Sequence, residues 1–461
     1  MNKPHAPNSW EGRAMKNVMA GFTDFPTLQE RGPVILTHGK GARVYDVAGR
    51  EYLDANSGLW NVVCGFDHEG LTEAMVEQTR RFPSYHAFFG RMADTSVELS
   101  EKLVEVSPFS SGRVFFTNSG SEANDTMVKM LWMMNRVEGK PNCRKIITRI
   151  NGYHGVTTVA ASMTGKPYNE HFGLPLPGFL HTSCPHYWRN GEGGESEEAF
   201  TARMARDLEE LIEREGADTI AGFFAEPVMG AGGVIPPSKG YFQAIHPILK
   251  AHKIPLISDE VICGFGRTGQ LWGCQTYDFM PDAIISSKVL TCGYMPLGAV
   301  ILGDDMAVRM QEASEKIEEF PHGFTASGHP VACAVGLKAI DIIMNEGLHE
   351  NARAISPYFM KRLNTFRDHP LVGEARGVGL MGALEVVKNK NTKESFDGSL
   401  SVSERLANAC QDNGLICRPL GPSIVLCPPF IFDETLTDEM FDKIEAALND
   451  VQAGLPTDAF D

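Results

Sequence analysis

The ten cysteines of this 461-residue chain include no Cys-x-x-Cys pair. In a chain this long we interpret them as reduced, mostly buried side chains of a cytoplasmic protein. The first seventeen residues lack the apolar run of a secretory signal peptide, so we expect none. No segment reaches the roughly 20 apolar residues that span a bilayer, because Glu226, Pro227 and four glycines interrupt the most apolar stretch, residues 219–235.

Positive charge is also scarce, with 42 Lys and Arg against 58 Asp and Glu and a net charge of −16. A phosphate-binding surface needs the opposite sign, so we expect neither nucleic acid nor an anionic membrane as a partner. The zinc signature HExxH and the hydrolase elbow GxSxG are both absent. His181, Cys184 and His186 lie close in sequence, but no second cluster completes a set of four ligands, so we predict no metal.

The composition is that of a globular protein, with 43% hydrophobic and 22% charged residues. Short apolar runs alternate with longer segments of helical periodicity, which favours parallel βαβ units and a doubly wound α/β sheet. The predicted strands are 114–116, 145–150, 220–225, 254–258 and 282–287. The predicted helices among them are 121–138, a segment from His154, 202–214 and 241–252.

The pattern changes after Ser327, which indicates a smaller α+β domain. Helical stretches at 330–345 and 349–367 precede apolar runs at 378–386, 415–418 and 423–427 and a last helix at 434–449. An N-terminal hairpin, residues 44–54, is expected to join this domain. We therefore predict an N-terminal segment 1–64 that contributes to the small domain, a large domain 65–328 and a C-terminal small domain 329–461.

Polar groups follow three predicted strands at their carboxyl ends, where α/β sheets bind ligands. Ser119, Gly120 and Ser121 open a helix and offer N–H groups to an anion. Asp259 and Lys288 end two further strands. Each feature alone has a commoner explanation, namely a helix cap, a loop aspartate and a solvated lysine. Together they match what pyridoxal phosphate needs: a seat for its phosphate, a carboxylate for its ring nitrogen and an amine for its aldehyde.

A competing motif, Gly264–Gly269, matches the dinucleotide fingerprint GxGxxG and follows a strand. That fingerprint requires a helix directly after it, and the next residues show no helical apolar stripe. We therefore consider a nicotinamide oxidoreductase the weaker hypothesis.

A series of segments spread over nearly the whole chain carries a resemblance to a known family. They are LDANSGLWNVVCGFDH (53–68), YHAFFGRM (85–92), FFTNSGSEANDTMVKMLW (115–132), GYHGVT (152–157), FFAEPVMGAGGVIPP (223–237), ISDEVICGFGRTG (257–269), AIISSK (283–288), HGFTASGHP (322–330) and LICRPLG (415–421). The chain resembles a class III aminotransferase of fold type I, most closely the ω-amino acid and amine–pyruvate transaminases. The resemblance implies pyridoxal 5′-phosphate as the cofactor.

By this resemblance Lys288 binds the cofactor covalently and moves the substrate proton, and Asp259 keeps the pyridine nitrogen protonated. The resemblance also implies a homodimer or a higher oligomer, because Thr325 would reach the phosphate of the partner subunit. The other implied cofactor-binding residues are Ser119, Gly120, Ser121, Tyr153, His154, Glu226 and Val261.

The substrates implied are an amine donor and a keto acid acceptor. Arg418 would bind the acceptor carboxylate through its guanidinium fork. Aromatic side chains would wall the pocket, namely Trp60, Phe88, Phe89 and Tyr168. Ornithine- and GABA-type relatives usually have, where this chain has Ala231, a glutamate that pairs with this arginine. Without that partner, Arg418 suits pyruvate better than 2-oxoglutarate. Val289 replaces the usual Asn or Gly after the lysine, with an effect that we leave open.

We therefore predict an aminotransferase that moves an amino group from an ω-amino acid or primary amine to pyruvate by a ping-pong mechanism, giving alanine. The alternatives on the same fold are an aminomutase, a dialkylglycine-type decarboxylase, a transaminase that uses 2-oxoglutarate and a non-catalytic binding protein. The identity of the donor and the choice between dimer and tetramer stay open.

Overall fold

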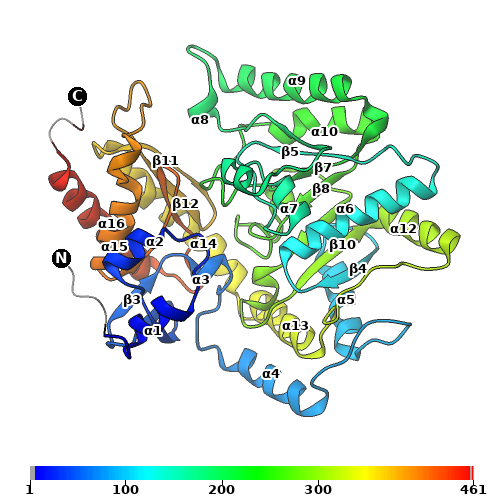
Figure 1. The fold of residues 1–461 in the computed structure, drawn as a ribbon, viewed down its shortest axis with the longest axis horizontal. Helices are drawn as coiled ribbons and strands as arrows, with labels where there is room; N and C mark the ends of the chain where they lie inside the picture. Colours follow the sequence, from blue (N-terminus) through cyan, green and yellow to red (C-terminus); the bar gives the residue numbers. More distant parts are fainter. Residues whose placement is uncertain (1–5, 457–458, 460–461) are drawn as a thin grey trace.

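The computed structural model describes residues 6–456 and 459 (Figure 1). Its centre is a seven-stranded sheet in which β10 alone runs antiparallel to its neighbours. The strand order is β4 (Gly112–Thr117), β10 (Gly298–Gly303), β9 (Ala283–Ser286), β8 (Leu256–Asp259), β7 (Ile220–Ala225), β5 (Lys145–Arg149) and β6 (Phe179–Thr182). The predicted mostly parallel α/β sheet is confirmed.

Helices cover both faces of this sheet (Figure 1). Ile284 packs into the core beneath α9 (Glu197–Glu215) and α10 (Tyr241–Ala251), whereas Ile285 packs into the core beneath α6 (Gly120–Val137) and α12 (Asp304–Ile317). Successive side chains of a strand point to opposite faces. A strand covered on both faces therefore has to be continuously apolar, which explains the unbroken apolar runs in the sequence.

The two ends of the chain meet in a second, smaller part of the molecule, at the left of Figure 1. One sheet has the order β1 (Leu36–Lys40), β2 (Arg43–Asp46), β3 (Glu51–Asp54) and β13 (Leu415–Ile416). The other has the order β11 (Val372–Val378), β12 (Met381–Val386), β15 (Ser423–Leu426) and β14 (Arg418–Leu420). Because β3 pairs with β13, the N-terminal hairpin joins the C-terminal region as predicted. The boundaries at 64 and 328 stay predictions.

Some predicted elements were wrong in detail. The run 378–386 is one end of β11, a turn and then β12, because Gly379 has a φ of +59° and reverses the chain. Residues 415–418 belong to two strands of different sheets, and the helix expected from His154 begins at Thr158.

The remaining α-helices of the described residues are α1 (Trp10–Asn17), α2 (Phe25–Arg31), α3 (Ser57–Trp60), α4 (Glu69–Arg81), α5 (Asp94–Val106), α7 (Thr158–Met163), α8 (Tyr187–Asn190), α11 (Gly273–Thr276), α13 (Pro330–Asn345), α14 (Leu348–Thr365), α15 (Val402–Asp412) and α16 (Glu434–Gly454).

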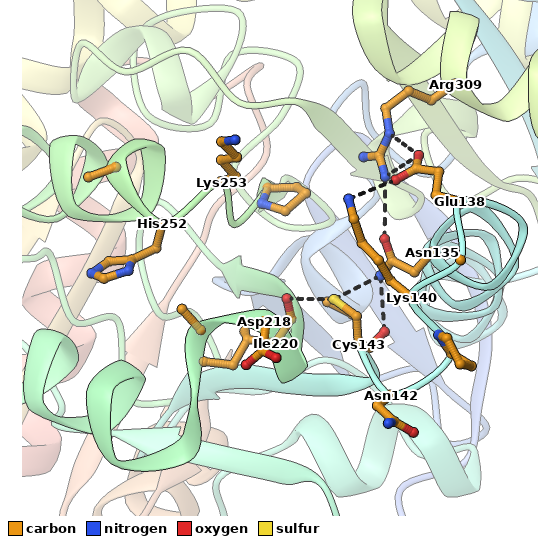
Figure 2. Close-up of a pocket in the computed structure, with 16 residues that line it drawn as sticks. Asn135, Glu138, Lys140, Asn142, Cys143, Asp218, Ile220, His252, Lys253 and Arg309 are labelled. Carbon is orange, nitrogen blue, oxygen red and sulfur yellow. Dashed lines mark hydrogen bonds and ion pairs between the residues drawn. The ribbon is translucent and has the colours of Figure 1, made fainter.

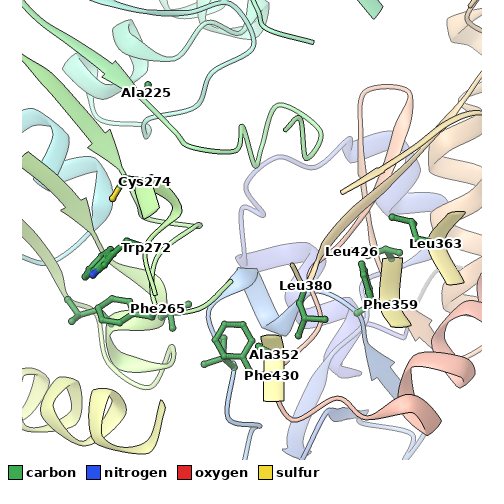
Figure 3. Packing of buried hydrophobic residues seen from close by; sticks show 14 of the residues in the cluster. Ala225, Phe265, Trp272, Cys274, Ala352, Phe359, Leu363, Leu380, Leu426 and Phe430 are labelled. Carbon is green, nitrogen blue, oxygen red and sulfur yellow. The ribbon is translucent and has the colours of Figure 1, made fainter. Parts of the chain in front are cut away.

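One apolar core runs from the large sheet into the smaller part (Figure 3). Phe265 and Trp272 follow β8, and Phe430 and Leu380 belong to the C-terminal region; all four are at most 1% exposed. A shared core of this kind holds the two parts in a fixed relation. Within residues 6–456 and 459, no helix combines the length and the apolar character needed to cross a membrane.

Candidate active site

A cavity of about 230 Å³ lies beyond the carboxyl ends of β4, β5, β7, β8 and β9. Its walls include every predicted cofactor-binding residue except Thr325, namely Ser119, Gly120, Ser121, Tyr153, His154, Glu226, Asp259, Val261 and Lys288. The fold therefore brings these residues together at the edge where a parallel sheet binds its ligands.

Lys288 is the second residue after β9 and has a φ of +51°, a conformation that few residues other than glycine adopt. Burial, the largest influence, lowers the pKa of Lys288 below its ordinary value, and the charges of Asp259 and Glu226 oppose this shift only in part. No hydrogen bond or ion pair ties its Nζ to another described residue. The amine is therefore available, and the lowered pKa shifts its protonation toward the uncharged, nucleophilic form.

Asp259 is 3% exposed and is held by two neighbours. Its Oδ2 accepts hydrogen bonds from Nδ1 of His154 at 2.7 Å and from Nδ2 of Asn124 at 2.9 Å. Because a carboxylate only accepts, Nδ1 of His154 is the donor in this contact. These contacts aim one carboxylate into the cavity in a single orientation.

Glu226 lies behind Tyr153 and is also 3% exposed. Its Oε1 accepts from the N–H of Tyr153 at 3.0 Å, and its Oε2 accepts from the N–H of Gly230 at 2.9 Å. Burial raises the pKa of Glu226. The contacts are structural, since they fix the loop that carries Tyr153 and the loop that follows β7.

The start of α6 forms a cradle that suits a phosphate. Ser119 caps the helix, with its Oγ accepting from the N–H of Glu122 at 3.2 Å. Gly120 and Ser121 line the cavity, and their N–H groups belong to the first turn of the helix, where they have no partner within the helix. A Cβ on Gly120 would lie only 2.9 Å from Cγ2 of Val261, so a larger residue there would displace the Val261 side chain.

Of the predicted substrate residues, Arg418, Trp60 and Tyr168 lie next to one another near the cavity. The Cζ of Arg418 is 5.8 Å from the ring centroid of Trp60, and no described carboxylate pairs with this arginine. Burial raises the pKa of Tyr168 to about 12, with Tyr153 adding to the shift and Arg418 opposing it. Trp60 is buried and does not itself line the cavity, although Leu59 and Asn61 on either side of it do.

Phe88, Phe89 and Thr325 do not reach the cavity of their own chain. Phe89 is 85% exposed, and Thr325 is exposed as well. Phe88 packs beside Gly323, where a Cβ would lie 2.6 Å from its ring. The three residues therefore share one region of the surface outside the cavity.

Several residues of the site were not singled out from the sequence. Asn124 joins Asp259 to the carbonyl of His154, to which its Nδ2 donates at 2.8 Å. Its position one turn into α6, after the Ser-Gly-Ser anion seat, is the only sequence signal that could have indicated it. Leu59, Asn61, Ile262 and Ser287 also line the cavity and show no such signal.

The competing sites receive little support. Gly264–Gly269 lies in turns, and the helix that follows it, α11, has only four residues. His186 lies within 4.8 Å of Glu374 and Glu385, a geometry that could hold a metal. However, the guanidinium of Arg376 already donates to both carboxylates, at 2.7 and 2.6 Å. His181 and Cys184 are not part of this group.

A larger groove, of about 820 Å³, lies at the opposite edge of the sheet (Figure 2). Its lining includes Ile220 at the start of β7 and Pro255 just before β8, so it borders the amino ends of the strands. Arg309 and Lys140 both pair with Glu138 there. Because this edge is not the one at which parallel sheets bind their ligands, we do not assign the reaction to it.

The fold and the cavity define a fold type I enzyme that depends on pyridoxal phosphate. The family model for class III aminotransferases matches residues 27–448. The chain belongs to this family and is a pyridoxal-phosphate-dependent aminotransferase.

Three known proteins illustrate the similarity. A PMP-bound aminotransferase structure from Vibrio fluvialis is 68% identical, covers 99% of this chain and 100% of that one, and superposes with a TM-score of 0.97. An omega-aminotransferase structure from Paracoccus denitrificans is also 68% identical, over 97% and 100% of the two chains, with a TM-score of 0.96. The mitochondrial gamma aminobutyrate transaminase 1 of Solanum lycopersicum is 42% identical over 95% of this chain and 85% of that one.

Proposed function

We propose that this aminotransferase transfers the amino group of an ω-amino acid or primary amine to pyruvate, with Lys288 as the catalytic residue. The observation that supports this most directly is the single cavity that collects Lys288, Asp259 and the start of α6. The similarity to an omega-aminotransferase and the unpaired Arg418 support the choice of substrates.

The residues fit pyridoxal phosphate. The N–H groups of Gly120 and Ser121, with the Ser121 hydroxyl, would bind its phosphate. Asp259 would hold a proton on the pyridine nitrogen, and Tyr153 and Val261 would contact the two faces of the ring. The cofactor supplies an electron sink that allows the proton beside the substrate amine to leave.

Lys288 would carry that proton. A base is most effective when its pKa lies near the working pH, and burial already lowers the pKa of Lys288. With no partner holding its Nζ, the amine can swing between the cofactor and the substrate. Amine and keto acid would then react in turn at one site, as ping-pong kinetics require.

Arg418 would bind the carboxylate of pyruvate. The chain has Ala231 where a glutamate would otherwise pair with this arginine, and no described carboxylate neutralises it. A second carboxylate, as in 2-oxoglutarate, would need a further cation, whereas pyruvate needs only one. A donor that has no carboxylate would leave Arg418 in contact with Trp60.

We also infer a homodimer in which Thr325 reaches the partner's phosphate site and Phe88 and Phe89 wall the partner's pocket. All three lie together on the surface, away from their own cavity. A cytoplasmic location is inferred from the ten free cysteines.

The test compares wild type with Lys288→Ala, and pyruvate with 2-oxoglutarate. We expect the wild type to show the visible absorbance of lysine-bound cofactor and to convert pyruvate to alanine with a panel of amines. Lys288→Ala should lose both, and an Lys253→Ala control, in the groove of Figure 2, should keep both. Full turnover by Lys288→Ala would refute the role of the lysine, and a clear preference for 2-oxoglutarate would refute the acceptor.

A further inference from the structure

The segment that follows β3, residues 56–61, has an unusual backbone for a substrate-facing turn. Ser57, Gly58 and Trp60 have φ angles of +48°, +65° and +64°. Residues other than glycine adopt positive φ angles at a cost in free energy. Such conformations persist only where neighbouring groups stabilise them. The turn places Leu59 and Asn61 in the wall of the cavity.

Asp54 holds this turn from inside. Its Oδ1 accepts from the N–H of Asn56 at 2.8 Å, and its Oδ2 accepts from the N–H of Gly58 at 2.5 Å. The side chain is almost fully buried, and no cation of the described chain forms an ion pair with it. Burying a carboxylate without a counter-ion costs free energy. Each of its two oxygens accepts from a backbone N–H, whereas a neutral amide has only one acceptor oxygen.

The same turn is connected to the arginine of the site through Asn56. In its favoured amide orientation Asn56 accepts from the backbone N–H of Arg418 at 2.9 Å and donates to the carbonyl of Val425 at 3.0 Å. Ser57 adds a second anchor, donating its hydroxyl to the carbonyl of Cys427 at 2.6 Å. Trp60, at the other end of the turn, lies against the guanidinium of Arg418.

We propose that Asp54 is a positioning residue that fixes Trp60 and Arg418 relative to each other and thereby sets the affinity for the carboxylate of the acceptor. This inference depends on the proposed role of Arg418. Asp54 does not touch the cavity and acts only through the turn, so its loss should affect substrate binding more than the reaction itself.

Protonation offers an independent test. Burial raises the pKa of Asp54 to about 6, against the opposing hydrogen bonds from Gly58 and Asn56. A protonated carboxyl turns one acceptor into a donor and cannot accept from both N–H groups. The ionisable groups around the turn are Cys427, Arg267, whose Nη2 lies 3.3 Å from Ser57, and Arg418. Pyruvate itself stays ionised throughout this range.

The experiment measures steady-state constants for pyruvate and for an aldehyde acceptor in wild type, Asp54→Asn and Asp46→Asn. Asp46 is a matched control, because it accepts from the N–H groups of Ala48 and Arg50, both at 2.9 Å, in a turn remote from the cavity. For Asp54→Asn we expect the KM of pyruvate to rise about tenfold, the change that corresponds to losing roughly one such interaction. The KM of the aldehyde, kcat and the visible cofactor absorbance should change little.

In wild type the KM of pyruvate should also rise as the pH falls below about 6, and Asp54→Asn should lack this rise. An unchanged KM in Asp54→Asn, or an equal rise for both acceptors, would overturn the proposal. If Asp54→Asn does not fold, a pH-independent KM in wild type between pH 5 and 7.5 would overturn it. Absence of pyruvate turnover in wild type would instead refute the proposed function.

Discussion

Glu260, the residue after Asp259, is buried for a structural reason. Its Oε2 accepts from the N–H of Gly273 and its Oε1 from the N–H of Cys274, both at 2.8 Å, and Ser258 also donates to it. Burial raises the pKa of Glu260 to about 7, although these hydrogen bonds oppose the shift. The buried carboxyl therefore stabilises the turn after β8. Because Asp259 is the preceding residue, this also helps to fix the orientation of its side chain.

This pKa predicts how stability depends on pH. The folded protein binds the proton of Glu260 more tightly than the unfolded chain, so stability falls as the pH rises from about 4.5 to about 7. The loss is at most about 1.4 kcal/mol for each pH unit. Glu260→Gln removes this contribution. As the pH rises from 5 to 8, the stability of the variant should therefore increase relative to that of wild type, measured as the midpoint of unfolding in denaturant. An equal pH dependence in both proteins would contradict the assignment.

At the scale of elements, the contact between β11 and the loop after β7 joins the two parts of the molecule. Nε of Arg376 donates to the carbonyls of Gly233 and Val234 at 3.1 and 3.0 Å. Its Nη1 pairs with Glu374 and Glu385. Burial would raise the pKa of Glu374, but the hydrogen bond from His186 and the charge of Arg376 hold it below its usual value. One guanidinium thus connects a strand of the small sheet to the loop that Glu226 anchors.

Replacing Arg376 by lysine keeps the charge and removes the planar fork. The lysine then leaves three or more of the buried acceptors around position 376 without a donor. We expect the free energy of unfolding to fall by about 2–4 kcal/mol. Arg367→Lys is the matched control, since among the described residues its exposed guanidinium donates only to the carbonyl of Ala375 at 3.2 Å. This variant should change stability by less than about 0.5 kcal/mol. Equal midpoints for the two variants in urea would contradict the prediction.

The features predictable from sequence are those that depend on strand ends. Lys288, Asp259 and the start of α6 converge because the carboxyl ends of parallel strands share an edge, and each directly follows or closes an apolar run. The clamp of Asn124 and His154 on Asp259 could not be predicted, because it depends on how α6 and the loop after β5 pack. The prediction of a single strand at 378–386 was wrong because the turn at Gly379 and Leu380 continues the apolar pattern of the strands on either side.

At the scale of the whole molecule, an apolar surface beside the loop 320–328 calls for an explanation. Its exposed side chains come from one segment after α4, namely Phe82, Tyr85, Phe89 and Met92. Monomeric proteins seldom expose contiguous apolar surface of this kind, and it commonly marks an interface. The dimer that we propose would cover it and place Thr325 and Phe88 against the partner's site.

Phe89→Asp tests this arrangement. A carboxylate in a covered apolar interface cannot be solvated, so association should weaken by tenfold or more and activity should become dependent on protein concentration. Met280→Asp, at a residue 52% exposed and remote from this segment, should leave both unchanged. Light scattering after size exclusion gives the mass, and dilution assays give the concentration dependence. If Phe89→Asp keeps the wild-type mass and its activity at all dilutions, the surface is not the interface, and the pocket must be complete within one chain.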